Sequence, residues 1–493
     1  MKYVISADQS TQGTKGLVFD ATGRLLSRAD LPHRQLVNDQ GWVSHDPEEI
    51  LSNLLRVIPM ALDQAGVSPA DVACMGISNQ RETTVAWDAE TGKPVCPAIV
   101  WQCSRATGIC RRLEETGIGD MVRDRTGIPL SPYFPASKMA WILEEVPEAR
   151  TLAENGRLRM GTVDAWLVFR LTGQFRTDYS NASRTQLFNI HTLAWDADIC
   201  RAFGIPLNCL PAVTDSDAVF GNTDLGGYLP GSIPVCGVLG DSHAALFGQG
   251  CLRPGMTKAT YGTGSSIMMQ IGEKPVSSRS GLVCSLAWKR RGRVDYVMEG
   301  NLNYTGAVIT WLKDQLGLIA SARETEALAF AAHPSDTTVL VPAFTGLGAP
   351  YWVSDARAMI CGMTRLTGKA EIVRAALDCI AFQIRDVVRA METDTGISVP
   401  VLRADGGPAG NSYLMQFQSD ILGSEVAVPN VEELSGIGAA YMAGLSAGVL
   451  DESVFQLLSY TAHAPSMSED RREELVRRWK QAVETVSHSV SPA

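Results

Sequence analysis

YVISADQSTQGTKGLVFDATGRLLSRA, which runs from Tyr3 to Ala29, contains three short apolar runs separated by polar turns. The Ser/Thr/Gly turn after the first run and the DATGR turn after the second predict three strands joined by tight connections. MTKATYGTGSSIMMQIGEKP, from Met256 to Pro275, repeats the order of strand, Thr/Gly turn and strand. One such unit in each half of the chain predicts two similar halves with a cleft between them.

The two turns, DQSTQGTK and YGTGSS, have a composition that suits phosphate. Successive backbone N–H groups in such turns converge on phosphate oxygens, and the hydroxyls add donors. The P-loop pattern is absent. Either turn alone is typical of an ordinary hairpin, whereas the pair favours phosphate binding. A third loop, GGPAGN from Gly406 to Asn411, joins a predicted strand to a predicted helix, and fits a nucleotide contact and close packing equally well.

Composition excludes several classes of protein. The chain has 493 residues with 45% hydrophobic and 19% charged residues, enough apolar material for two domains. A net charge of -10 argues against binding to nucleic acid, which needs a basic surface. The 11 cysteines form no C-x-x-C pair, which favours free thiols in a reducing compartment. No signal peptide or membrane-spanning run is recognisable, so we expect a cytoplasmic protein without membrane insertion.

Helix signals occur in three places. Asp46 and Pro47 have the chemistry of a helix cap and first helical residue, and Pro59 predicts a kink or a stop in that helix. A long apolar periodicity predicts a helix near residues 370–391, and a last helix is expected after Ser468.

Arg81 and Glu82 are adjacent in SNQRETTVAW. At the end of a strand over a cleft, both side chains could reach one ligand, and a guanidinium fork with a carboxylate suits vicinal hydroxyls. The alternative, which the local sequence favours, is a surface ion pair.

Asp241, Ser242 and His243 follow the predicted strand IPVCGVLG. An aspartate at the carboxyl end of a strand fits a general base or a metal ligand. The trio also suggests a hydrolase, but a histidine so close in sequence to its aspartate is no basis for a triad. We therefore expect Asp241 alone to carry the chemistry, and a helix to begin near His243.

A series of motifs resembles the FGGY carbohydrate kinases, and within them the glycerol kinases. The resemblance runs in order from about residue 3 to residue 485 and is carried by NQRETTVAWDAETGKPVCPAIVWQC (79–103), SPYFPASKMAWIL (131–143), GTVDAWLVFRLTG (161–173), TDYSNASRTQLFNIHTLAWD (177–196), TYGTG (260–264), FTGLGAPYW (344–352) and LMQFQSDILG (414–423).

The resemblance implies an α/β protein with an actin-like ATPase fold, in which two ribonuclease-H-like domains close on a cleft. The N-terminal domain would span residues 1–249, with the polyol site and the first phosphate turn, and the C-terminal domain residues 250–493, with the nucleotide site. It implies phosphoryl transfer from ATP, with Mg²⁺, to a terminal hydroxyl of a small polyol or sugar. Similar proteins are often homodimers or homotetramers, and we expect one of these states.

Residue roles carried over from the resemblance fall into four groups. Asp241 would be the catalytic base, and Asp8 and Asp241 the metal-binding carboxylates. Nucleotide contacts would come from Thr11, Thr263, Gly264, Gly306, Gly407 and Asn411. Substrate contacts would come from Arg81, Glu82, Trp101, Tyr133, Asp241, Ser242 and Ser266.

The sequence departs from the glycerol kinase pattern in the substrate wall. Ser242 stands where Gln is usual and Ser266 where Phe is typical, which predicts a wider, more polar pocket for a polyol or ketose of four or five carbons. Glycerol remains the alternative substrate. DQSTQGTK replaces a Gly-Thr-Thr turn, and Val353 stands where Asp is usual. LGGYLPGSIPV (225–235) lacks the arginine of the family's fructose 1,6-bisphosphate loop, so no inhibition by that compound is expected.

A non-catalytic sugar sensor on the same fold is the remaining alternative. Such a sensor would be expected to lose the base or the metal ligand, yet Asp241 and Asp8 are both present.

Overall fold

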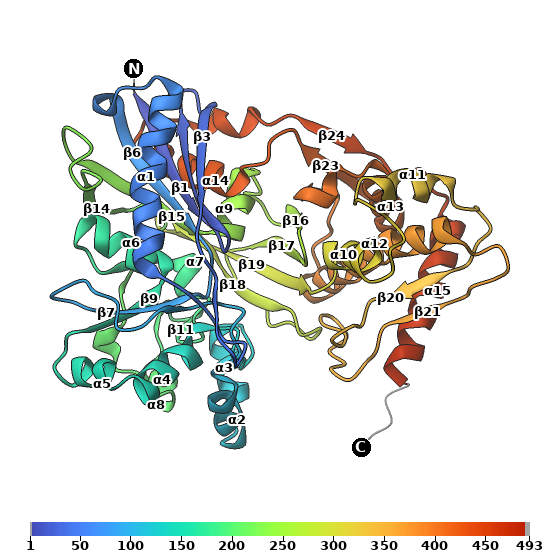
Figure 1. The fold of residues 1–493 in the computed structure, drawn as a ribbon, viewed down its shortest axis with the longest axis horizontal. Coiled ribbons are helices and arrows are strands. Elements are labelled where there is room, and N and C mark those ends of the chain that lie inside the picture. The colour runs from blue at the N-terminus through green and yellow to red at the C-terminus, as the bar shows by residue number, and fades with distance from the viewer. Residues whose placement is uncertain (1, 489–493) are drawn as a thin grey trace.

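The computed structural model describes residues 2–488, which form two lobes (Figure 1). The sheet of the N-terminal lobe has the order β14 (Val219–Thr223), β15 (Ile233–Gly240), β6 (Val72–Asn79), β1 (Tyr3–Gln9), β2 (Gly13–Phe19), β3 (Leu25–Pro32). The sheet of the C-terminal lobe has the order β18 (Val283–Arg290), β19 (Arg293–Leu302), β17 (Ser265–Gly272), β16 (Thr257–Tyr261), β22 (Val401–Asp405), β23 (Glu425–Pro429), β24 (Tyr460–His463).

The two sheets share one topology. In the first, β1 pairs antiparallel with β2 and parallel with β6, and β15 continues the sheet in parallel. In the second, β16 pairs antiparallel with β17 and parallel with β22, and β23 continues the sheet in parallel. The two predicted polar turns are the hairpin connections β1–β2 and β16–β17. The predicted duplication of the strand-turn-strand unit is therefore confirmed.

Smaller sheets and helices surround the N-terminal sheet. A five-stranded sheet has the order β4 (Leu36–Val37), β5 (Val43–His45), β8 (Ala98–Ile99), β7 (Thr84–Asp88), β9 (Leu158–Thr162), and two-stranded pairs join β10 (Arg176–Asp178) to β13 (Ala212–Thr214) and β11 (Phe188–Asn189) to β12 (Ala194–Trp195). The helices are α1 (Pro47–Ala65), α2 (Thr107–Glu115), α3 (Gly119–Thr126), α4 (Pro135–Glu145), α5 (Pro147–Glu154), α6 (Val163–Thr172), α7 (Tyr179–Ala182), α8 (Ala197–Ala202) and α9 (Asp241–Gly248).

Helix α1 begins as predicted, because Asp46 Oδ1 accepts a hydrogen bond of 2.9 Å from Glu48 N and Pro47 occupies the first turn. The helix packs on β2 and β3 through buried residues on both sides of Pro59, including Leu54 and Leu62. Of the kink or stop predicted at Pro59, the stop is wrong and the kink stays a prediction: the helix continues to Ala65, because apolar packing on either side compensates for one missing backbone hydrogen bond.

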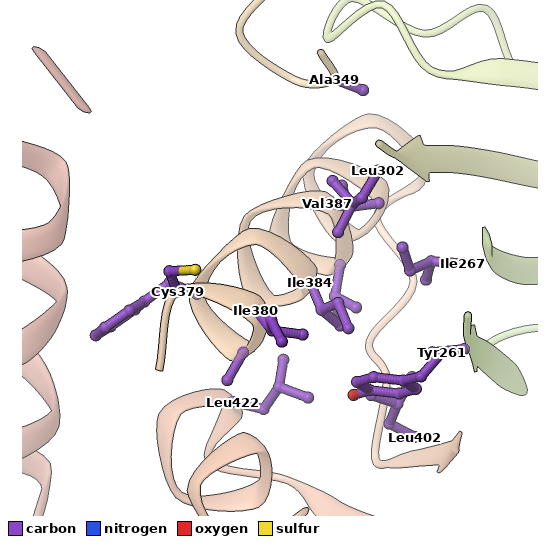
Figure 2. Packing of buried hydrophobic residues seen from close by; sticks show 14 of the residues in the cluster. Tyr261, Ile267, Leu302, Ala349, Cys379, Ile380, Ile384, Val387, Leu402 and Leu422 are labelled. Atoms are coloured by element: carbon purple, nitrogen blue, oxygen red, sulfur yellow. The ribbon is translucent and has the colours of Figure 1, made fainter. Parts of the chain in front are cut away.

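The C-terminal lobe is built around α12 (Lys369–Thr395), which matches the predicted long helix. Ile380, Ile384 and Val387 on this helix lie against Ile267 and Leu302 of the sheet (Figure 2). Its other elements are α10 (Gly306–Asp314), α11 (Glu324–Ala331), α13 (Ser412–Leu422), α15 (Glu469–His488) and the pair β20 (Val339–Val341) and β21 (Met359–Cys361). Helix α15 confirms the helix predicted after Ser468.

Helix α14 (Leu434–Ser446) returns from the second sheet to the first lobe, where it packs on α9, β6 and β15. The approach is close: a Cβ on Gly438 would lie 1.8 Å from Ala244 O, and one on Gly76 would lie 2.2 Å from Ala439 O. A segment far beyond residue 250 thus contributes to the N-terminal lobe, while the domain boundary at 249/250 stays a prediction.

All eleven cysteines are free thiols, as the sequence predicts, and nine of them are buried. Within residues 2–488, no helix is long and apolar enough to span a bilayer.

Candidate active site

A cavity of about 710 Å³ opens where the two hairpin turns face each other. Helix α9, the loop between β6 and β7, and the end of β19 complete its wall. It brings together ten of the predicted site residues, which lie far apart in the sequence: Thr11, Arg81, Glu82, Trp101, Tyr133, Asp241, Ser242, Thr263, Gly264 and Ser266.

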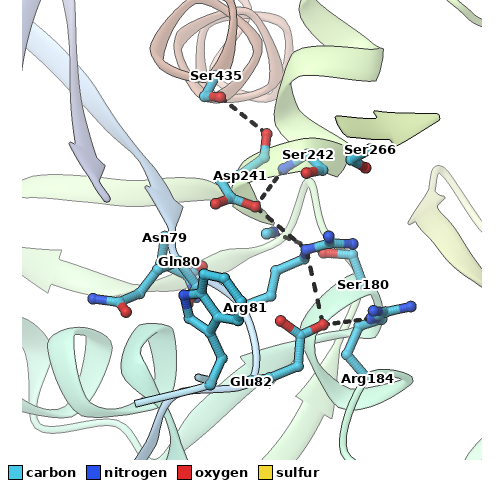
Figure 3. A network of polar contacts seen from close by, with 12 residues as sticks. Asn79, Gln80, Arg81, Glu82, Ser180, Arg184, Asp241, Ser242, Ser266 and Ser435 are labelled. Carbon is cyan, nitrogen blue, oxygen red and sulfur yellow. Dashed lines mark hydrogen bonds and ion pairs between the residues drawn. The ribbon is translucent and has the colours of Figure 1, made fainter. Parts of the chain in front are cut away.

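Asp241 is the first residue of α9, directly after β15. Its Oδ1 accepts a hydrogen bond of 2.6 Å from Ser242 N and lies 3.3 Å from Arg81 Nε, while the carboxylate is 34% exposed (Figure 3). Ser435 Oγ, on α14, donates to the Asp241 carbonyl at 3.0 Å and so holds the backbone there. The second oxygen, Oδ2, has no hydrogen-bond partner among residues 2–488, which leaves it available to accept a proton from a ligand.

Glycine precedes Asp241 for a steric reason. A Cβ on Gly240 would lie 2.7 Å from Arg81 Cγ, so only glycine leaves room for the arginine beside the aspartate. The helix begins two residues earlier than the sequence suggested, at Asp241 rather than His243.

His243 does not complete a hydrolase triad. Its ring is fully buried, and neither ring nitrogen has a hydrogen-bond partner in the described part of the chain. Burial, reinforced by the positive charge of Arg81, holds the pKa of His243 well below its ordinary value, so the ring is neutral. The arrangement contains none of the contacts by which a histidine would activate Ser242.

Arg81 and Glu82 lie in the loop that follows β6, and their side chains are only 5% and 2% exposed. The interpretation as a surface ion pair is therefore wrong. Arg81 Nη1 and Nη2 donate to Glu299 at 3.0 and 2.8 Å, and Arg184 Nε donates to Glu82 Oε1 at 2.6 Å. The guanidinium group of Arg81, which the sequence predicted to bind substrate, is thus hydrogen-bonded to the buried carboxylate of Glu299. The role of Arg81 and Glu82 in substrate binding stays a prediction.

Sequence reasoning missed Glu299 and Arg184, both fully buried. Arg184 Nη1 lies 2.8 Å from Glu299 Oε2, so one arginine joins the two glutamates. Burial alone would raise the pKa of Glu299, but Arg184 and Arg81 outweigh it and hold that pKa well below its ordinary value. The available signal was a glutamate that directly follows an apolar run in β19, because charges are buried only when they are paired.

Trp101 and Tyr133 form an aromatic wall, with ring centroids 5.5 Å apart. Trp101 Nε1 donates to Thr11 Oγ1 at 2.9 Å, which ties this wall to the first hairpin turn. The arrangement presents an apolar surface for a carbon chain beside the polar groups of the loop and α9.

A second cavity, of about 860 Å³, brings together the predicted residues Gly306, Gly407 and Asn411. Asn411 Oδ1 caps α13 by accepting from Leu414 N at 3.0 Å. Gly306 N donates to Gly262 O at 2.9 Å, so the start of α10 is joined to the second hairpin turn. This turn lines the first cavity and is hydrogen-bonded to Gly306 of the second, as expected if phosphates extend from one cavity toward the other.

Asp8 lies at the end of β1 and is 6% exposed. Burial, with the neighbouring charges of Asp241 and Glu433, raises its pKa to about 6 against the opposing charge of Lys15. Its Oδ1 is buried and has no hydrogen-bond partner in the part of the chain that the structure describes. An orphaned carboxylate oxygen fits a divalent cation, although no cluster of three acidic, histidine or cysteine ligands exists within residues 2–488. Such a site suits Mg²⁺, which keeps water and phosphate oxygens as its other ligands.

Comparison with known proteins assigns the family. Residues 3–248 match the N-terminal domain of the FGGY family of carbohydrate kinases, and residues 257–447 match its C-terminal domain. The chain belongs to the FGGY family of carbohydrate kinases. It is therefore a phosphotransferase that acts on an alcohol group, which removes the hydrolase and sensor alternatives.

Two relatives of this FGGY kinase are similar over nearly their whole length. Glycerol kinase 2 of Thermotoga maritima is 48% identical and glycerol kinase of Symbiobacterium thermophilum is 47% identical, with 98% of each chain covered in both cases. The crystal structure of Plasmodium falciparum glycerol kinase with ADP superposes with a TM-score of 0.94 at 35% identity, covering 99% of this chain and 98% of that one. A ligand-bound xylulose kinase of Lactobacillus acidophilus reaches 0.89 at 20% identity, covering 99% of both chains, and shows the shared fold alone.

Proposed function

We propose that this kinase transfers the terminal phosphoryl group of ATP to a primary hydroxyl of a polyol or ketose longer than glycerol. The observation that supports the transfer is the position of Asp241, which lines the same cavity as both hairpin turns and has one carboxylate oxygen with no hydrogen-bond partner among residues 2–488. Ser242 and Ser266 support the longer acceptor, because both line this cavity where a glycerol kinase would be expected to carry larger side chains.

In the proposed reaction, the acceptor lies along Trp101 and Tyr133 with one hydroxyl beside Asp241. Asp241 takes the hydroxyl proton, the oxygen bonds to the terminal phosphorus, and the bond from that phosphorus to the bridging oxygen of ADP breaks. Backbone N–H groups of the hairpin turns orient the phosphates. Asp8 would hold Mg²⁺, which neutralises phosphate charge when it is bound.

Glycerol itself is the second candidate, and a specific observation favours it. The relatives that match the whole chain at 44–48% identity are named glycerol kinases. The three carbons of glycerol would leave part of the cavity to water.

The acceptor is tested by ADP release from ATP and Mg²⁺ with glycerol, erythritol, threitol, ribitol, xylitol, arabitol, erythrulose, ribulose and xylulose. We expect the highest kcat/KM with a four- or five-carbon acceptor, by about tenfold over glycerol, the discrimination that one added group gives. If glycerol is best, the two serines are tolerated variations and the second candidate holds.

Asp8→Asn should raise the free Mg²⁺ concentration for half-maximal rate by roughly 10–100-fold, the loss typical of a weakened metal site. The fold should persist, because burial and like charges already oppose the ionised form of Asp8. The matched control is Asp39→Asn at an exposed aspartate of the same lobe. An unchanged Mg²⁺ requirement would show that Asp8 has another role.

A further inference from the structure

The hydroxyl group of Ser266 lies in the cavity that contains Asp241 and is hydrogen-bonded to a buried carboxylate. Ser266 lies on β17 and is partly exposed to the cavity. Asn301 on β19 is its register partner, so Glu299, two residues before Asn301, lies on the same face of the sheet. Ser266 Oγ and Glu299 Oε1 are 3.0 Å apart, which makes a hydrogen bond between them.

The direction of this hydrogen bond is fixed by charge. Glu299 accepts two hydrogen bonds from Arg81 and forms an ion pair with Arg184. Two neighbouring guanidinium groups keep its carboxylate ionised. An ionised carboxylate has no proton to donate. The hydroxyl proton of Ser266 must therefore point to Glu299, away from the cavity.

Toward a ligand in the cavity, Ser266 Oγ can therefore act only as a hydrogen-bond acceptor. A serine hydroxyl has one proton and two lone pairs, and the proton is used. In the described part of the chain, no donor bonds to Ser266 Oγ. A ligand hydroxyl can donate to this oxygen, whereas a ligand carbonyl brings further lone pairs and leaves both oxygens unpaired.

Ser242 provides the contrast. Its backbone N–H is bonded to Asp241, but its hydroxyl has no partner among residues 2–488, so it can rotate to donate or to accept. Ser242 should therefore not distinguish a hydroxyl from a carbonyl.

We propose that Ser266, oriented by Glu299, is a specificity-determining residue that accepts a hydrogen bond from a substrate hydroxyl and so selects polyols over ketoses. This inference rests on the proposed kinase reaction and names the chemical class of its acceptor. Glu299 acts through Ser266 and Arg81 as a positioning residue.

The test compares kcat/KM for matched pairs that differ in one oxidation: glycerol and dihydroxyacetone, erythritol and erythrulose, threitol and erythrulose, ribitol and ribulose. The wild-type chain should prefer the better polyol of each carbon number by about tenfold or more, because an acceptor built for a hydroxyl rejects the analogue that lacks it. Ser266→Ala should lower kcat/KM for the polyols about tenfold, leave the ketoses nearly unchanged and bring the ratio close to one.

Ser242→Ala is the matched control, a hydroxyl removed from the same wall, and it should leave the polyol/ketose ratio as in the wild type. Glu299→Gln is the second variant: its amide can donate to Ser266, free the serine proton and raise the relative rate with ketoses.

Two results would overturn the inference: a wild-type preference for ketoses, or a polyol/ketose ratio that Ser266→Ala leaves unchanged. Failure of the proposed kinase reaction looks different, because no acceptor would then stimulate ADP release, and that result would remove this inference as well. A best kcat/KM with glycerol would overturn only the proposed length of the acceptor, and the polyol/ketose ratio would still test Ser266.

Discussion

Asp241→Asn should lower kcat by roughly 10²–10⁴-fold, the contribution of a positioned general base. Asparagine keeps the shape of the side chain and can still accept the 2.6 Å hydrogen bond from Ser242 N, so the start of α9 should be preserved. It cannot take a proton from the acceptor. KM for the acceptor should change far less than kcat, because the lost interaction belongs to the transition state.

The measurement is steady-state ADP release with the best acceptor of the panel. Asp224→Asn, at an exposed aspartate directly after β14 in the same lobe, is the control and should retain wild-type kcat. Unchanged turnover in Asp241→Asn would show that another group is the base.

Arg184→Leu should destabilise the N-terminal lobe by about 3–5 kcal/mol, the cost of breaking a buried ion pair from one side. Arg184 is fully buried, and its loss would leave Glu82, 2% exposed, with Arg81 Nε at 3.9 Å as its one ion-pair partner within residues 2–488. The charge of Glu299 would lose one of its two arginines at the same time. Leucine fills most of the volume of the aliphatic part of the arginine side chain, so the loss of stability should come from the missing positive charge.

Urea denaturation measures this cost. Arg112→Leu is the matched control, because Arg112 forms an equally short pair with Glu144, 2.6 Å, on the surface, where the side chains are 59% and 48% exposed. Exposed pairs contribute about 0–1 kcal/mol. Equal losses of unfolding free energy in the two variants would contradict the conclusion that Arg184 stabilises the buried network it forms with Glu82 and Glu299.

Local features of the fold were predictable from sequence. The hairpins β1–β2 and β16–β17 follow from apolar runs around Gly/Thr turns, and the start of α1 follows from the cap at Asp46. The continuation of α1 through Pro59 was not predictable, because the tertiary packing that outweighs the lost hydrogen bond lies on other strands.

The site was predictable only where its residues carry local sequence signals. Asp241 follows a strand, and its glycine neighbour marks a close approach, both of which are local signals. The partner of Arg81 is Glu299, 218 positions away, so no local pattern could join them. The buried network joins residues of both lobes, and local sequence patterns do not relate such residues to one another.

The nature of the product tests the central claim most directly. The purified chain, ATP, Mg²⁺ and the best acceptor of the panel are incubated, and the products are followed by ³¹P NMR and mass spectrometry. The account predicts equal amounts of ADP and an acceptor phosphorylated on a primary carbon, with no product from Asp241→Asn on the same time scale. Inorganic phosphate in place of a phosphorylated acceptor would contradict it, because the site would then hydrolyse ATP and not transfer its phosphoryl group to an alcohol.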